Sequence, residues 1–283
     1  MSVESLVTEI YEKLPKGQKK VAEYLLRNHV EFSISTASQI AKRIDVSEAT
    51  VIRFSYALNY KSFSHMQKSF QAEFLADPNS ESLQESSFQL DDPNNDLINK
   101  IVTRETEILQ QMQGMDRKIF WQTADLLMNT KHVKIVGNLA SYAAAYWFYL
   151  KLNMMRENVT LLSNELNASF DNLLLTEPEE TIFILISMPS YVVSTLNIGK
   201  HAKEQGAKIL TITDRKLSPT GRIADICLTT DIGIHSEAMI SISSVMSLIN
   251  LITSGIESKY EDEISERVRS INKYYTDTNF VIE

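Results

Sequence analysis

Cysteine is almost absent from this sequence, and glycine and histidine are sparse and scattered. Cys227 is the single cysteine among 283 residues, so no internal disulfide can form and a reducing compartment is expected. The five histidines do not cluster with cysteine at metal-binding spacing. Gly137 lacks the companion glycines of a dinucleotide fingerprint, and there is no Walker lysine. The sequence therefore predicts no metal, no nucleotide and no other cofactor.

A long hydrophobic run without polar side chains is also missing. Residues 238–256 form a 19-residue uncharged run, which is long enough to span a membrane. Seven Ser, Thr and Asn side chains within that run indicate instead a helix buried inside protein. The first ten residues lack the basic-then-apolar layout of a secretion signal. We therefore expect a cytoplasmic protein with no membrane partner.

Positive charge is scarce overall and unevenly placed. The formal net charge of −8 argues against a chain that coats nucleic acid along its whole length. Residues 1–76 hold 10 Lys and Arg against 8 Asp and Glu, a charge of +2, whereas residues 77–283 hold 18 against 28, a charge of −10. A chain of 283 residues suggests two domains. Any contact with nucleic acid is therefore expected in the N-terminal segment.

Residues 36–58 have the pattern of two short helices joined by a tight turn. Thr36, followed three residues later by Gln39, is the reciprocal capping pattern that starts a helix. Asp45 stands where the turn needs a left-handed backbone, which Asp tolerates better than most residues. Ser47 can cap the second helix. The apolar face of that second helix is formed by Val51, Phe54 and Leu58.

The opposite face of the second helix is suited to reading DNA. It carries Ala49, Arg53, Tyr56 and Tyr60. A recognition helix contacts base edges with its N-terminal residues, and Arg53 can pair with guanine or bind phosphate. The residues predicted to contact DNA are Thr36, Ser47, Glu48, Ala49, Thr50, Arg53, Tyr56 and Lys61. The alternative is an ordinary helical hairpin whose polar face is solvated.

Further helices are expected around this pair. Residues 5–13 and 16–29 have helical patterns separated by Pro15, and another helix follows residue 58. Three lysines lie just ahead of the apolar face of the helix over residues 16–29: Lys16, Lys19 and Lys20. They either touch the DNA backbone or are solvated. Residues 78–95 lie in a stretch rich in Ser, Asp, Asn and Pro, which predicts a linker. The DNA-binding domain is accordingly predicted at residues 1–77.

In the remainder of the chain, residues 96–283, short apolar strands alternate with helices. The expected strands are 132–137, 159–162, 181–187, 207–214 and 225–230. The expected helices are 96–113, 116–129, 140–155, 191–204, 236–257 and 261–275. Strands that are nearly continuously apolar and separated by helices predict a parallel sheet covered on both faces.

Three turns at the carboxyl ends of these strands carry hydroxyl groups: residues 137–141, 186–195 and 212–219. Ligands of open parallel sheets bind beyond this edge, and hydroxyls with free helix amides favour phosphate or another anion. The alternative is that the hydroxyls only cap helices. His235 and Glu237 could form an acid–base pair. The simpler alternative is that Glu237 is a carboxylate at the start of a helix, where the helix dipole favours a negative charge.

The segment VSEATVIRF, residues 46–54, resembles the end of the helix-turn-helix of RpiR-family bacterial transcription regulators. The layout of the second half, with ITDRKLSPTGRIAD at residues 212–225, resembles the sugar isomerase (SIS) domain of that family. The resemblance covers roughly residues 1–77 and 124–264. It implies an all-α helix-turn-helix domain followed by an α/β domain, a five-stranded parallel sheet that binds phosphosugars.

The resemblance also indicates ligand residues in two loops. The pattern GxGxS is matched by Gly137 and Ser141, with Leu139 at its second glycine. The pattern SxSGxT begins with Ser187 and then departs at Pro189, Ser190 and Val192. Because proline has no amide hydrogen, this loop offers an anion one donor fewer. The predicted ligand residues are Gly137, Ser141, Ser187, Ser190, Tyr191 and Ser194.

The sequence thus predicts a dimeric or tetrameric regulator of carbohydrate metabolism genes, not an enzyme. It would bind a double-stranded DNA operator, and a phosphorylated sugar or related metabolite would control it. One alternative is a sugar-phosphate isomerase with an accessory helical domain, for which only His235 and Glu237 offer a base. Another is a SIS-fold scaffold that has lost its ligand.

Overall fold

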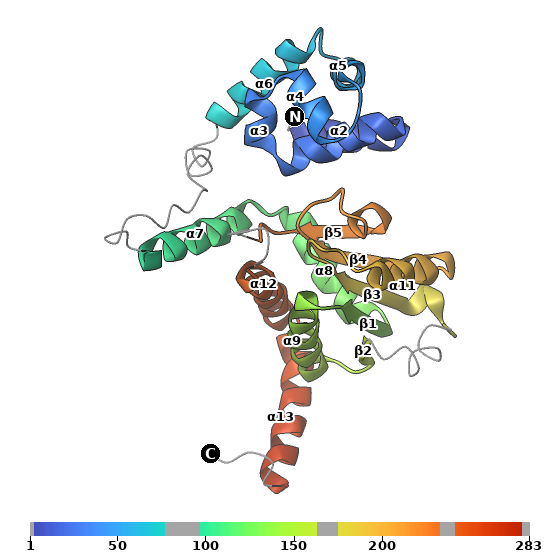
Figure 1. Cartoon of the computed structure of the whole chain (residues 1–283). Helices are drawn as coiled ribbons and strands as arrows, with labels where there is room; N and C mark the ends of the chain where they lie inside the picture. The colour runs from blue at the N-terminus through green and yellow to red at the C-terminus, as the bar shows by residue number, and fades with distance from the viewer. Residues whose placement is uncertain (1–2, 77–96, 163–174, 233–240, 279–283) are drawn as a thin grey trace. The chain divides into compact units, whose positions relative to one another are not determined.

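The computed structural model describes residues 3–76, 97–162, 175–232 and 241–278. The chain divides into two compact units, Met1–Pro93 and Asn94–Glu283, and each unit is described by itself (Figure 1). The expected linker, residues 78–95, lies outside the described residues.

The described part of the N-terminal unit, residues 3–76, consists of helices and the turns between them. Its helices are α1 (Val3–Ile10), α2 (Lys16–Arg27), α3 (His29–Ile34), α4 (Ala37–Arg43), α5 (Glu48–Ala57) and α6 (Phe63–Ala76). Apolar side chains at helical spacing form its core, among them Val21, Leu25, Phe32, Ile40, Met66 and Phe70. The prediction of one helix over residues 16–29 is wrong. Asn28, with φ −132° and ψ 54°, leaves the helical conformation and separates α2 from α3.

The two helices predicted over residues 36–58 form as α4 and α5. The Thr36 amide donates to Gln39 Oε1 at 2.8 Å, and the Gln39 amide donates to Thr36 Oγ1 at 3.2 Å, which completes the capping box. Asp45 adopts the expected left-handed conformation, with φ of 53°. Ser47 Oγ accepts from the Thr50 amide at 3.2 Å and caps α5. The predicted apolar face, Val51, Phe54 and Leu58, is buried.

The C-terminal unit is built on a five-stranded parallel sheet, which confirms the predicted fold class. Its strands are β1 (His132–Gly137), β2 (Val159–Leu162), β3 (Thr181–Ile186), β4 (Lys208–Thr213) and β5 (Ile226–Thr229), in the order β2-β1-β3-β4-β5. From β1 the chain steps outward to β2, whereas β3 to β5 proceed to the other side of β1. The strand order therefore reverses between β1 and β3, which is where such sheets bind ligands.

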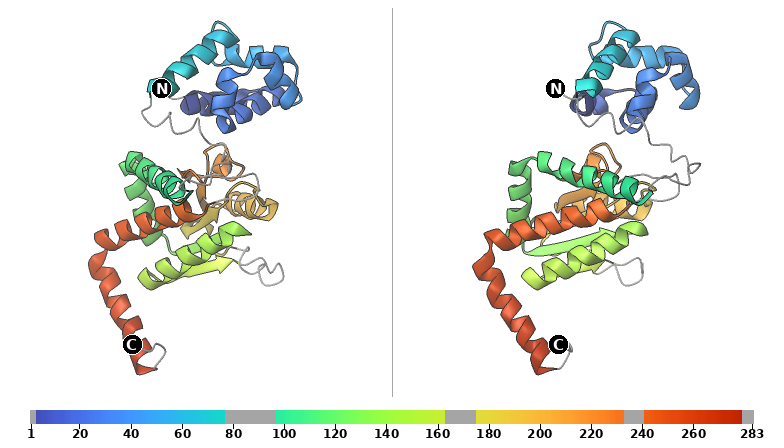
Figure 2. Two further views of the ribbon diagram at one scale, coloured as in Figure 1. Left: turned by 60° about the vertical axis from the view of Figure 1, so that its left-hand side comes forward. Right: turned by 90° about the vertical axis from the view of Figure 1, so that its left-hand side faces the viewer.

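Helices cover both faces of this sheet (Figures 1 and 2). The covering helices are α8 (Arg117–Asn129), α9 (Ala140–Met155), α11 (Val193–Glu204) and α12 (Ser243–Lys259). Outside them, α7 (Leu97–Gln111) packs on α12, and α13 (Glu261–Asp277) packs on α9 and α12. In β3, Ile182, Ile184 and Ile186 pack into the core beneath α9 and α12, and the alternate residues Phe183 and Leu185 face α11. Both faces of β3 are buried, so the strand is apolar throughout.

Residues 243–256 of the uncharged run belong to α12, which buries one face in the core, as predicted, and leaves the other face, with Asn250, Leu251 and Ser254, exposed. Within α12, Gly255 lies so close to α8 that an added Cβ would be 2.4 Å from Phe120 Cζ. The predicted start at residue 236 is wrong for the described part, because the helix begins at Ser243 and residues 241–242 are not helical. No helix among the described residues combines the length and apolar character needed to cross a membrane.

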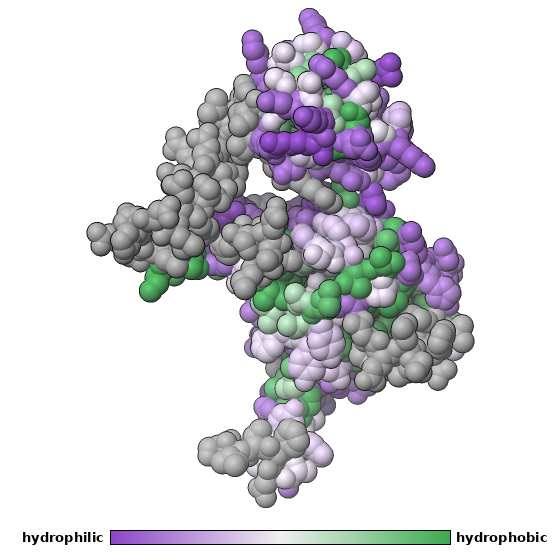
Figure 3. All heavy atoms as spheres, in the orientation of Figure 1, coloured by the Kyte–Doolittle hydropathy of each residue, from purple (hydrophilic) through white to green (hydrophobic). Residues whose placement is uncertain are grey.

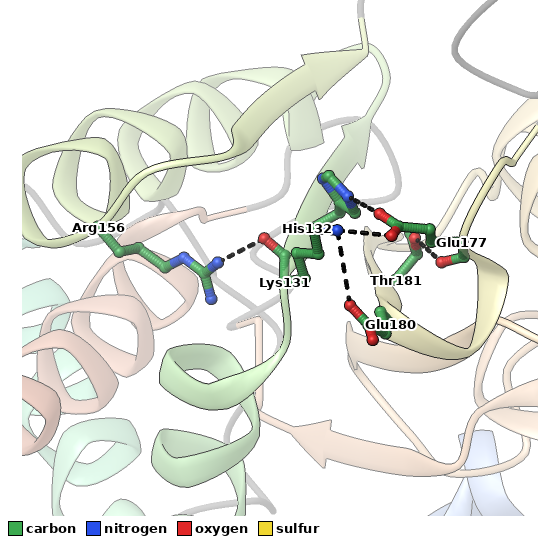
Figure 4. A network of polar contacts seen from close by, with 6 residues as sticks. All are labelled: Lys131, His132, Arg156, Glu177, Glu180 and Thr181. Atoms are coloured by element: carbon green, nitrogen blue, oxygen red, sulfur yellow. Dashed lines mark hydrogen bonds and ion pairs between the residues drawn. The ribbon is translucent and has the colours of Figure 1, made fainter.

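The amino ends of β1 and β3 are joined by a polar network (Figure 4). Glu177 accepts from Lys131 Nζ at 2.5 Å and lies 2.9 Å from His132 Nε2. Thr181 Oγ1 donates to the Glu177 carbonyl at 2.7 Å, and Arg156 donates to the Lys131 carbonyl at 2.8 Å. The hydrogen bond from Lys131 holds the pKa of Glu177 below its ordinary value. These polar groups satisfy one another at this edge of the sheet.

Candidate functional site

The outward face of α5 presents side chains that are free to contact another molecule. Glu48, Ala49, Arg53 and Tyr56 are exposed. Arg53 makes no hydrogen bond or ion pair with any residue that the structure describes, so its five donors are available. The placing of Tyr60 on this face is wrong. Tyr60 lies beyond the end of α5, and its ring packs edge-on against Phe70 at 5.7 Å.

Three of the predicted DNA-contacting residues also have a structural use. Thr36 and Ser47 are helix caps, and Ser47 Oγ lies 2.8 Å from Thr50 Oγ1. The methyl group of Thr50 faces α2, since its Cγ2 is 3.0 Å from where a Cβ on Gly17 would lie. Lys61 is exposed in the connection between α5 and α6. Arg53 and Lys61 are therefore the predicted cations left accessible near this helix.

The three lysines near the start of α2 differ from one another. Lys19 forms an ion pair with Glu12 at 3.0 Å and lies over the Tyr11 ring at 4.9 Å. Lys20 Nζ is 3.5 Å from the carbonyl of Asp45, in the turn before α5. Lys16 is exposed. Lys19 thus has partners within its own unit, whereas Lys16 and Lys20 are exposed. The choice between contact with the DNA backbone and simple solvation therefore stays open for Lys16 and Lys20.

Two helices of the C-terminal unit begin at the carboxyl edge of the sheet, beside the reversal between β1 and β3. Helix α9 follows β1, and α11 follows the loop after β3. The first amides of a helix have no partner within it and carry a partial positive charge. Neither α9 nor α11 has a side-chain hydrogen bond that caps its start. The predicted serines at this edge therefore do not serve as helix caps.

The loops after β1 and β3 are in contact at this edge. Ser141 Oγ, in the first turn of α9, accepts from the Met188 amide at 3.4 Å, so the loops after β1 and β3 touch. Ser187 is buried directly after β3, and its hydroxyl has no hydrogen bond to a described residue. Ser194 Oγ, in α11, accepts from Asn138 at 3.3 Å. Ser190 is exposed in the same loop.

The third predicted turn, after β4, is tied to the loop after β3. Thr213 Oγ1 donates to the Ser187 carbonyl at 2.7 Å, and the Tyr191 hydroxyl donates to Asp214 Oδ1 at 2.7 Å. Arg215 places its guanidinium carbon 5.7 Å from the centre of the Tyr191 ring. Sequence reasoning named this turn but none of its residues. The available signal was a run of polar side chains directly after an apolar strand.

Backbone geometry at this edge explains which positions need glycine. A Cβ on Gly137 would lie 2.6 Å from the Ser141 carbonyl oxygen, so only glycine allows α9 to start this close to β1. Leu139 has φ 54° and ψ −128°, and Ser190 has φ 68°. Both stand where the SIS patterns have glycine, and both keep a positive φ. The loops thus retain a glycine-like conformation at the expense of backbone strain.

His235 and Glu237, for which an acid–base pair and a helix-terminal carboxylate are the two alternatives, lie outside the described residues. Within the described ranges, no group of three His, Cys, Asp or Glu side chains is placed to hold a metal ion.

Comparison with known proteins gives matches in both units. A family model described as "Helix-turn-helix domain, rpiR family" matches residues 1–77, and the SIS domain model matches residues 126–254. The chain belongs to the RpiR family. It is a transcriptional regulator that joins an RpiR-type helix-turn-helix domain to a SIS domain.

Two relatives of this RpiR-family chain are both named uncharacterized HTH-type transcriptional regulators. The Haemophilus influenzae protein is 26% identical over 224 residues, which cover 78% of this chain and 77% of the relative. The Thermotoga maritima protein is 27% identical over 247 residues, which cover 85% and 86%. Among solved structures, Vibrio vulnificus NanR complexed with ManNAc-6P has a TM-score of 0.60 at 16% identity, covering 96% of this chain and 97% of NanR. At that identity the likeness concerns the fold alone.

Proposed function

We propose that this RpiR-family protein represses or activates carbohydrate metabolism genes by binding an operator, and that a phosphorylated sugar or related metabolite in its SIS domain controls it. Residues 1–77 would bind DNA, residues 78–95 would be the linker, and residues 96–283 would bind the effector. The observation that carries the proposal is the contact between the loops after β1 and β3, where Ser141 Oγ accepts from the Met188 amide beside the starts of α9 and α11, which no side chain caps.

A phosphate fits this edge of the sheet on chemical grounds. The partial positive charge at the starts of α9 and α11 favours an anion, and the hydroxyls of Ser141 and Ser187 can donate to its oxygens. In α9 the Ser141 and Tyr142 amides already donate to the Asn138 and Leu139 carbonyls, so at this helix the hydroxyls are the main donors. A hydrogen bond to a charged acceptor contributes roughly 1.5–3 kcal/mol. The sugar phosphate bound by NanR, a protein of similar fold, supports the same ligand class.

A regulatory rather than enzymatic role is proposed for two reasons. The relatives are named transcriptional regulators. Asp214, a carboxylate at this edge, already accepts a hydrogen bond from the Tyr191 hydroxyl, so it is engaged as an acceptor rather than held ready as a base. An isomerase would instead require His235 or Glu237 to reach the ligand.

Control by an effector further requires that two arrangements of the protein differ in DNA affinity, and we propose a homodimer or homotetramer as the unit that rearranges. Helix α9 supports this, because Tyr142, Tyr146 and Leu150 are exposed at successive turns of one face. Figure 3 shows hydrophobic side chains in the open on the visible face of this unit. Sedimentation velocity on the full chain measures the assembly directly.

Thermal unfolding with a panel of sugars tests the effector site. Phosphorylated sugars should raise the melting temperature of the full chain, and their unphosphorylated parents should not. A ligand at a hundred times its dissociation constant adds about 2.7 kcal/mol of stability. S141A and S187A should each reduce the shift, whereas S254A, which removes an exposed hydroxyl from α12, should leave it unchanged. The active sugar phosphate should also change operator affinity in a fluorescence anisotropy titration.

If no sugar phosphate, inorganic phosphate or sulfate changes the melting temperature, the effector proposal is wrong and the domain is a scaffold without a ligand. Interconversion of the sugar phosphate by the pure protein would instead favour the isomerase.

A further inference from the structure

Arg215 is a buried cation with an unmet donor at the carboxyl edge of the sheet. It follows the end of β4 by two residues, and its side chain is only 11% exposed. Its Nε is fully buried and has no hydrogen-bond partner in the described part of the chain. The carboxylate of Asp214 lies 3.9 Å away, which is too far for a hydrogen bond.

The neighbouring carboxylate cannot supply what this guanidinium lacks. Asp214 Oδ1 accepts from the Tyr191 hydroxyl at 2.7 Å. Thr213 Oγ1 lies 3.1 Å from the same oxygen, but its one proton is directed to the nearer Ser187 carbonyl. The bond from Tyr191 holds Asp214 in place, so its carboxylate offsets part of the charge of Arg215 without accepting a hydrogen bond from Nε. A buried charge with an unsatisfied donor destabilises the fold unless something else pairs with it. A second oxyanion beside Arg215 would complete the arrangement.

The position of Arg215 connects it to the proposed effector site. Its guanidinium stacks at 5.7 Å over the ring of Tyr191, which belongs to the loop after β3. That loop contains Pro189, which has no amide hydrogen to give an anion. Ser187 of the same loop is held through its carbonyl by Thr213, two residues before Arg215. Arg215 is therefore packed against the loop after β3, which offers one amide donor fewer than the SIS pattern because of Pro189.

We propose that Arg215 binds the phosphate of the effector and takes over the role of the amide that Pro189 lacks. Arginine suits this role, because its planar fork matches two phosphate oxygens at once and stays charged at every relevant pH. Tyr191 would then act as a positioning residue that holds the guanidinium through its ring and is itself held by Asp214. This role rests on the proposed effector site, and in it Arg215 is the residue that makes the site selective for phosphate.

Isothermal titration of the full chain with inorganic phosphate, and with the sugar phosphate that gives the largest thermal shift, tests this proposal. R215Q should weaken both affinities by about tenfold or more, since a charge-assisted pair is lost. R215K keeps the charge but loses the fork, and its affinities should fall between those of R215Q and wild type. K216Q is the matched control, because Lys216 is exposed beside Arg215 and the variant removes the same charge.

Stability without ligand separates a binding role from a structural one. R215Q removes an unsatisfied buried charge, so its melting temperature without phosphate should equal or exceed that of wild type. The proposal would be overturned if R215Q melted below wild type while R215K bound phosphate as tightly as wild type. Arg215 would then be a structural residue. Equal phosphate affinity of wild type, R215Q and R215K would do the same. Failure of wild type to bind any phosphate would overturn the effector site itself.

Discussion

Asn138 Nδ2 donates a hydrogen bond of 2.7 Å to Thr195 Oγ1 and so joins the loop after β1 to the first turn of α11. Asn138 is buried, and its amide also reaches Ser194 Oγ at 3.3 Å. One side chain thus holds together the two helix starts that flank the reversal of the strand order. Neither residue is near the other in sequence, and the sequence patterns singled out neither Asn138 nor Thr195.

Replacing Asn138 by alanine should destabilise the C-terminal unit and weaken effector binding. The change leaves the buried Thr195 hydroxyl without its partner, which costs roughly 1–3 kcal/mol. Urea unfolding of the full chain, followed by circular dichroism, measures the loss. N197A is the control, because Asn197 lies on the exposed side of the same helix. Equal unfolding midpoints for N138A and N197A would contradict the prediction.

Replacing Leu139 by glycine should stabilise the protein. Leu139 has φ 54° and ψ −128°, a conformation that favours glycine, and its side chain is 72% exposed, so little packing is lost. The relieved strain of about 1–3 kcal/mol exceeds the entropic penalty of glycine, roughly 0.5–1 kcal/mol. Thermal unfolding should show a higher melting temperature for L139G. L139A keeps a Cβ and should not gain, and a similar gain in both variants would rule out strain as the cause.

Replacing Arg53 by alanine should weaken binding to the operator. Loss of a base contact costs about 1–3 kcal/mol, or roughly tenfold in affinity or more. A gel-shift titration at fixed salt measures the change, with circular dichroism to show that the fold is intact. K68A removes an exposed positive charge from α6 and should have a much smaller effect. The prediction fails if R53A and wild type bind equally.

The Glu177 network predicts a dependence of stability on pH. The pKa of Glu177 is below its ordinary value because Lys131 and His132 hydrogen-bond to its carboxylate. The resulting stability is present above the ordinary carboxyl pKa of about 4.3 and is lost as pH falls through the lowered pKa. E177Q should therefore melt below wild type at pH 7, and the gap should close in acid. E179Q removes the same charge two residues away, and the difference between its melting temperature and that of wild type should not shrink in acid in this way.

Local patterns in the sequence were sufficient for much of the fold. The capping pair Thr36 and Gln39, the turn residue Asp45 and the short apolar strands act within a few residues, so their outcome hardly depends on the rest of the chain. Strands β1 and β2 and helix α9 lie at the residues predicted for them. The reason is that the two periods, 2.0 for strands and 3.6 for helices, are set by backbone geometry.

Other features required the tertiary structure. The break at Asn28 and the start of α12 at Ser243 lie within stretches whose composition is compatible with one continuous helix. Tyr60 has the spacing of the α5 face but packs on Phe70, because a burial site on α6 was available. Propensity and periodicity are weak where packing against another element decides the outcome.

The sequence by itself determined the two kinds of domain, the helix-turn-helix and the edge of the sheet where a ligand would bind. Only the tertiary structure brought Asn138 to Thr195, Ser141 to Met188 and Arg215 to Tyr191. Each of these pairs joins a residue after one strand to a residue that follows a different strand. Such contacts depend on the order of strands in the sheet and on side-chain burial, and no pattern of neighbouring residues encodes them.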